Sequence, residues 1–137
     1  MSSRALGRRA SARTGAARLG AGPLALVGAM AVSGAIHLAR PAVFDRAVPR
    51  GMPGSARGWV LVSGVAELAC AATTLWPPTR AAGGLASAAL MAGVFPANVQ
   101  MALDARRPRT RAITLLRLPL QIPLVLWGLQ AARSAPR

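Results

Sequence analysis

The chain has 137 residues, of which 17 are basic and three acidic, and 53% of it is apolar. A basic nucleic-acid-binding domain carries such a charge but does not place half of its residues in apolar runs, so nucleic acid is not the partner that we expect. The same apolar content excludes disorder over most of the chain. Every basic residue is Arg, and we interpret the charge as arginines that flank membrane segments.

Cysteine and histidine are scarce, because Cys70 and His37 are each the single residue of their type. One thiol excludes an intrachain disulfide, a Cys-x-x-Cys redox pair and a thiolate metal site built from this chain alone. One histidine excludes a bis-histidine haem within a protomer. We therefore expect no metal site, no cofactor of the chain's own, no catalytic residues and no catalytic activity of the chain by itself.

Residues 1–20 hold five arginines among Ser, Ala and Gly, and they are predicted to form a basic disordered tail. The alternative is a secretory signal with a cleavage site near residues 29–31. Residues 21–133 contain four apolar blocks, each long enough to cross a hydrocarbon core of about 30 Å as a helix. The predicted transmembrane helices cover residues 21–40, 59–76, 81–103 and 112–132. The predicted fold class is all-α, an integral membrane four-helix bundle in contact with the lipid bilayer.

The three connectors differ in kind. Residues 77–80 form a tight turn, residues 41–58 are expected to lie in the membrane interface as a short amphipathic segment, and residues 104–111 are basic and aqueous. The arginines divide equally between the two sides of the membrane, so their count leaves the orientation open. The usual dominance of the first helix favours cytoplasmic termini. The expected location is a bacterial plasma membrane, with several passes.

Ionisable residues at bilayer depth are costly and indicate a functional site. Glu67 lies near the middle of the second predicted helix and Arg117 lies in the fourth. These two helices run in the same direction in an up-and-down bundle, so an ion pair between them is possible. His37, Asn98 and Gln121 fall in the same half of the membrane. We predict that all five line a polar binding pocket that opens toward the longer connectors.

Structural alternatives remain for the same residues. The Glu67–Arg117 pair can serve only to fix the register of the helices, and Asn98 and Gln121 can serve only to join them. Three prolines at positions 96, 119 and 123 each remove a helical hydrogen bond and free a backbone carbonyl. Asn98 and Gln121 are well placed to bond to such carbonyls.

Four short motifs follow one another in a characteristic order: Gly34-Ala35-Ile36-His37, Ser63-Gly64-Val65-Ala66-Glu67, Val94-Phe95-Pro96-Ala97-Asn98 and Arg117-Leu118-Pro119-Leu120-Gln121. In this order and spacing they resemble the DoxX family of small four-helix membrane proteins, over about residues 24–130. The resemblance implies a four-helix membrane fold. It also implies an association with quinone-linked sulfur oxidation or with membrane oxidoreductase assemblies.

The expected function is therefore that of a small accessory or quinone-interacting subunit of a membrane oxidoreductase assembly. His37, Arg117 or Gln121 would bond to the quinone carbonyls, and Glu67 would relay protons. A redox enzyme or a second copy of the chain is the expected protein partner. Two alternatives stay open, namely a small proton-coupled transporter or exporter that uses Glu67, and a structural membrane protein with no chemistry of its own.

Overall fold

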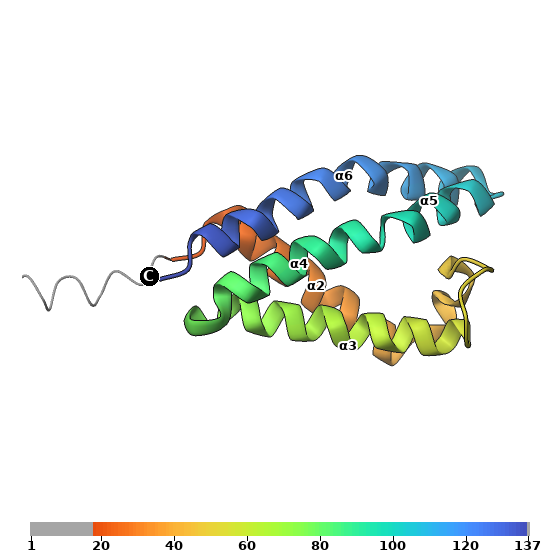
Figure 1. Cartoon of the computed structure of the whole chain (residues 1–137). Helices are drawn as coiled ribbons and strands as arrows, with labels where there is room; N and C mark the ends of the chain where they lie inside the picture. Colours follow the sequence, from red (N-terminus) through yellow and green to blue (C-terminus); the bar gives the residue numbers. More distant parts are fainter. Residues whose placement is uncertain (1–17, 137) are drawn as a thin grey trace, which may run out of the picture.

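The computed structural model describes residues 18–136, and this part of the chain is an all-α bundle (Figure 1). Its helices are α2 (Ala21–Ala39), α3 (Ala56–Leu75), α4 (Arg80–Gly93), α5 (Phe95–Asp104) and α6 (Pro108–Arg133), with 3-10 turns η1 (Pro41–Val43), η2 (Asp45–Ala47) and η3 (Pro77–Thr79). Four segments are long and apolar enough to cross a membrane: Ala21–Ala39, Ala56–Leu75, Pro77–Asp104 and Pro108–Arg133. The predicted all-α four-helix bundle is confirmed, and its architecture is that of a multi-pass membrane protein. The predicted basic tail falls almost entirely on residues 1–17, outside the described part.

The helices form a closed ring in which α2 packs on α3, α3 on α4, α4 on α6, and α6 back on α2. Helices α3 and α6 therefore lie diagonally opposite each other. Helix α5 continues the direction of α4 and packs mainly against α6. The start of α2, the end of α6 and the α3–α4 turn lie at one end of the bundle, and the long connector and the α5–α6 turn lie at the other (Figure 1).

The third membrane segment is not the single helix that the sequence predicts over residues 81–103. It breaks at Val94 into α4 and α5, and Pro96 stands in the first turn of α5. Proline has no backbone N–H, so it cannot donate to the carbonyl of Ala92, and it is tolerated best in a first helical turn. The last helix begins at Pro108 rather than at residue 112, since proline also suits that first position.

Glycines let the helix backbones approach closely at two crossings. A Cβ atom on Gly34 of α2 would lie 2.7 Å from the carbonyl oxygen of Gly64 on α3. A Cβ atom on Gly84 of α4 would lie 2.6 Å from the carbonyl oxygen of Gly128 on α6. Membrane helices gain little from the hydrophobic effect against each other, so close backbone packing is a main source of their association.

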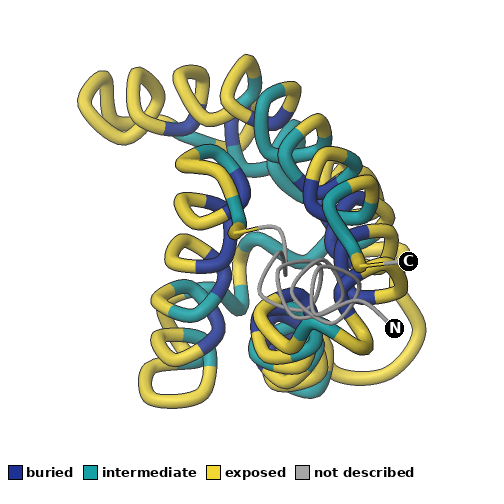
Figure 2. Tube along the Cα trace, turned by 90° about the vertical axis from the view of Figure 1, so that its left-hand side faces the viewer, coloured by how far each residue is buried: buried dark blue, intermediate teal, exposed yellow. Residues whose placement is uncertain are grey.

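Large apolar side chains cover the outside of the bundle. Buried residues line the inward sides of the helices while the outward sides are exposed (Figure 2). Six exposed side chains from three helices illustrate this outer surface: Val32, Val62, Val65, Leu116, Ile122 and Leu126. Such a surface would promote aggregation in water but suits contact with lipid chains.

Arg80 is buried at the α3–α4 turn, a position that its sequence context does not distinguish from those of the flanking arginines. It is 5% exposed, and its guanidinium donates to the carbonyls of Thr74 and Leu75, each at 3.4 Å. These carbonyls belong to the last turn of α3, where a helix carries partial negative charge. Arg80 therefore closes the C-terminal end of α3.

Replacing Arg80 with methionine keeps much of the aliphatic stem but removes its donors. We expect the free energy of unfolding in detergent to fall by about 2 kcal/mol, the usual value of hydrogen bonds to a charged group. Arg133→Met is the matched control, because Arg133 is exposed in the last turn of α6, and it should change stability by less than about 0.5 kcal/mol. Equal melting of the two variants would refute the capping role of Arg80.

Candidate ligand-binding site

A cavity of about 630 Å³ lies between the helices in the half of the bundle nearest the long connector. This volume is within the range of about 300–1,000 Å³ that is usual for small-molecule pockets. Its deep end is apolar and includes Leu26, Met30 and Met91 from the buried core. All five predicted site residues line it: His37, Glu67, Asn98, Arg117 and Gln121.

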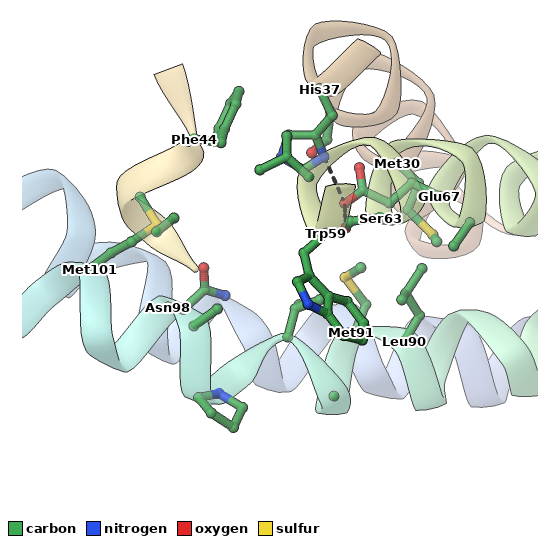
Figure 3. A pocket seen from close by; sticks show the side chains of 18 of the residues that line it. Met30, His37, Phe44, Trp59, Ser63, Glu67, Leu90, Met91, Asn98 and Met101 are labelled. Atoms are coloured by element: carbon green, nitrogen blue, oxygen red, sulfur yellow. Dashed lines mark hydrogen bonds and ion pairs between the residues drawn. The ribbon is translucent and has the colours of Figure 1, made fainter. Parts of the chain in front are cut away.

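Glu67 and His37 form the polar centre of one wall of this pocket (Figure 3). Glu67 is only 4% exposed, and its Oε1 lies 3.3 Å from Nδ1 of His37. Ser63, one turn earlier on α3, donates a hydrogen bond to the same Oε1 at 3.2 Å. His37 is held on its other side by Phe44, whose ring meets it edge to face at 4.3 Å between centroids.

Two polar atoms of this pair are buried without a hydrogen-bond partner in the described part of the chain. They are Oε2 of Glu67 and Nδ1 of His37, whose contact with Oε1 lacks hydrogen-bond alignment. A buried polar atom left without a partner is destabilising, typically by about 1–3 kcal/mol. The wall therefore has unused hydrogen-bonding capacity for a ligand.

The close crossing of α2 and α3 explains why His37 meets Glu67. Gly34 precedes His37 by three residues and Gly64 precedes Glu67 by three, so each side chain lies about one turn from the glycine contact. A Cβ on Gly64 would lie 2.9 Å from Cβ of His37. Bulkier residues at the crossing would separate the helices and the two side chains with them.

The predicted ion pair between Glu67 and Arg117 is wrong in this structure. Both residues lie in the same half of the bundle, but α3 and α6 are diagonal neighbours and do not pack together. Arg117 is exposed at the rim of the pocket. Within residues 18–136 the imidazole of His37, and not Arg117, contacts Glu67, and the guanidinium of Arg57 pairs with Asp45. Arg117 lies in the half of α6 that packs beside α5, and not beside α3, which carries Glu67.

Asn98 and Gln121 bridge α5 and α6, apart from the His37–Glu67 pair. The Asn98 side-chain N–H donates to Oε1 of Gln121 at 2.8 Å, and the Gln121 side-chain N–H donates to the carbonyl of Met91. Met91 lies in the last part of α4, just before the break that Pro96 accompanies. Gln121, 6% exposed, thus uses both ends of its amide to brace the broken helix. The carbonyl that it satisfies is that of Met91, not Ala92, and Asn98 remains the amide closer to the pocket mouth.

The long connector contributes side chains to the pocket and contains two short 3-10 turns rather than one continuous helix. Its backbone folds through η1 and η2, and Phe44, Val48 and Met52 line the cavity. Its return to α3 is fixed by Trp59, whose indole N–H donates to the carbonyl of Pro53 at 2.6 Å. The three prolines of the connector interrupt any longer helix there.

A bidentate contact also ties the connector to α3. Nε and Nη2 of Arg57 donate to the two carboxylate oxygens of Asp45 at 3.0 and 2.8 Å. This hydrogen bonding, helped by the positive charge, holds the pKa of Asp45 below its ordinary value of 3.8. A lowered pKa in the folded chain means that the contact stabilises the fold above about pH 4, and that this contribution disappears as the pH falls through the folded value.

Asp45→Asn should therefore remove a pH-dependent part of the stability. We expect the melting temperatures of the variant and the wild type to differ at neutral pH and to converge below about pH 4. Thermal unfolding in one detergent over a pH series measures this. If the difference in melting temperature between the variant and the wild type persisted unchanged at the lowest pH, the Arg57 contact would not be the cause of that difference.

The pocket holds a buried carboxylate and an imidazole beside apolar side chains. Within the described residues no three His, Cys, Asp or Glu side chains gather to hold a metal ion. Sequence reasoning missed three pocket residues, Phe44, Ser63 and Trp59, as members of the site. The pocket joins an apolar interior to a buried carboxylate and imidazole, which suits an amphipathic molecule with hydrogen-bonding groups.

No curated protein and no solved structure matches this chain. One family model matches residues 26–132, from the deep end of the pocket in α2 to the last turn of α6. Its description is a domain of unknown function, DUF8561. The matched residues include the whole of the pocket and most of the chain, and the protein belongs to this family.

Proposed function

We propose that the chain is a small membrane subunit that binds a quinone headgroup in this pocket and presents it to a membrane oxidoreductase, in a bacterial plasma membrane. The observation that carries the proposal is the buried Glu67–His37 pair, with unused polar atoms, facing an apolar cavity at membrane depth. A quinone headgroup is an apolar ring with hydrogen-bond acceptors at its two ends. It matches a cavity whose polar groups stand on separate walls.

His37 would donate to one quinone carbonyl, oriented by the carboxylate of Glu67, which in turn accepts the hydrogen bond of Ser63. Asn98, on α5, would serve the other carbonyl with the second N–H of its amide, since the first donates to Gln121. Arg117 at the rim would face the polar exit of the pocket. In this proposal the partner enzyme would carry out electron transfer.

Transport through the bundle is the second candidate, because Glu67 is a buried carboxylate with a free oxygen. The packing favours binding instead. At the end opposite the mouth, a Cβ on Gly83 would lie 2.5 Å from backbone atoms of Thr73 and Thr74, and Gly84 lies equally close to Ala132. Backbone contact this close leaves no space for a passage at these two helix crossings.

The test uses Trp59 as a built-in reporter, because it lines the pocket while Trp76 and Trp127 do not. Purified full-length protein in detergent is titrated with a short-chain quinone analogue, and the quenching of tryptophan emission is recorded. We expect saturable quenching that is lost in Trp59→Phe. An alkylbenzene of similar size, which lacks the carbonyls, should compete at least about tenfold more weakly, since two hydrogen bonds are missing. Quenching that does not saturate, or equal competition, would overturn the proposal.

A further inference from the structure

A second cavity, outside the pocket, lies between the long connector and the end of α5. We call it the basic cleft; it has a volume of about 590 Å³ and is lined by three arginines, Arg46, Arg50 and Arg106. Two carboxylates, Asp45 and Asp104, also line it. The cleft is thus formed by two connectors that lie far apart in sequence and meet at the same end of the bundle.

The two carboxylates of the cleft already have partners. Both oxygens of Asp45 accept hydrogen bonds from Arg57, and Asp104 accepts one from Gln100 at 3.0 Å. In the described part of the chain, Arg46, Arg50 and Arg106 have no hydrogen bond or ion pair. Arg57 neutralises Asp45, whereas Gln100 is uncharged, so three arginines face one uncompensated carboxylate, Asp104, in this concave site. The remaining positive potential favours an anion, and a guanidinium binds phosphate in a bidentate manner.

The position of the cleft indicates which anion. It lies where two membrane segments end, between the start of α3 at Ala56 and the end of α5 at Leu103 and Asp104. Apolar side chains stand beside the arginines: Leu103, which is 75% exposed, and Met52 both line the cleft. A soluble anion gains nothing from exposed apolar neighbours, whereas a phospholipid has an acyl chain to place against them.

We propose that the basic cleft binds the headgroup of an anionic phospholipid at the membrane surface. Arg46, Arg50 and Arg106 hold the phosphate, and the first part of the acyl chains lies against Leu103 and Met52. The cleft and the pocket share Val48, Pro49 and Met52 as a common wall, so a bound lipid would brace the connector that lines the pocket. The proposal does not depend on what the pocket itself binds.

Delipidated full-length protein in detergent tests this by native mass spectrometry, with phosphatidylglycerol and phosphatidylcholine of identical acyl chains as probes. We expect the wild type to bind phosphatidylglycerol at least about tenfold more tightly. The triple variant Arg46→Gln/Arg50→Gln/Arg106→Gln should lose this preference. Arg109→Gln/Arg111→Gln/Arg133→Gln removes the same charge from exposed positions outside the cleft and should keep it.

Three outcomes would overturn the proposal. Equal binding of the two lipids by the wild type removes the headgroup site. An equal loss in both triple variants shows attraction by net charge alone. Suppose millimolar glycerol phosphate displaces phosphatidylglycerol and the protein binds these two ligands with equal affinity. The cleft is then a site for a soluble phosphate instead of a lipid. The substituted arginines are all exposed, so both variants should fold, and their melting in phosphatidylcholine verifies it.

Discussion

Gly34→Val should be among the most destabilising single substitutions in this chain. Even the first added carbon would lie 2.7 Å from the carbonyl oxygen of Gly64, 2.9 Å from the Leu68 side chain and 3.2 Å from Cβ of Glu67. A backbone oxygen cannot rotate away, so α2 and α3 must separate. Overpacking of this kind costs about 1–3 kcal/mol and sometimes more, and we expect about 3 kcal/mol from thermal unfolding in detergent.

Gly28→Val provides a matched control in the same helix. A Cβ on Gly28 would meet no atom within 4 Å, so it carries the same change in helix propensity without the clash. Its melting temperature should stay close to that of the wild type. Gly34→Ala, with a smaller clash, should retain the fold and still weaken binding in the pocket, since it moves His37 away from Glu67. Equal melting temperatures of Gly28→Val and Gly34→Val would mean that α2 and α3 are not in close backbone contact at Gly34.

The second large effect is expected at Glu67, on binding rather than on stability. Glu67→Gln preserves the size of the side chain and an acceptor for Ser63, but removes the carboxylate. We expect quinone affinity to fall at least about tenfold, corresponding to about 1.4 kcal/mol, because the variant loses a charge-assisted contact in a buried site. Titration of Trp59 quenching measures it.

The control for charge is Asp104→Asn, since Asp104 is exposed and outside the pocket. It should leave quinone affinity unchanged. The change at Glu67 should also be non-additive with His37→Gln, because the two side chains are in contact. Additive effects of the two substitutions, or full affinity in Glu67→Gln, would mean that the pair does not act on the ligand.

The number of membrane helices and the half of the bundle that holds the polar residues could be predicted from the sequence. Apolar length alone identifies the four segments, and an up-and-down order places His37, Glu67, Asn98, Arg117 and Gln121 in one layer. These signals are local or depend only on chain direction. They remain valid even where the observed helix boundaries differ from the predicted ones, as at Pro108 and Val94.

Which of these side chains meet could not be predicted, because that depends on the order of helices around the bundle. A diagonal arrangement of α3 and α6 replaced the expected Arg117 partner of Glu67 with His37. A signal for the correct pair was present, since Gly34 and Gly64 each stand three residues before one partner. Two glycines at matching offsets predict a close crossing only once the two helices are known to be neighbours. The fold of the connector depends likewise on tertiary contacts such as Arg57 with Asp45.

A quinone held by the Glu67–His37 wall should remain bound when the chain is gently extracted from its own membranes. Native mass spectrometry of the full-length chain measures this. We expect a bound species with the mass of a quinone in the wild type, absent from Glu67→Gln and retained in Asp104→Asn. A chain that carries phospholipid alone, or a quinone retained equally by the wild type and Glu67→Gln, would contradict this expectation.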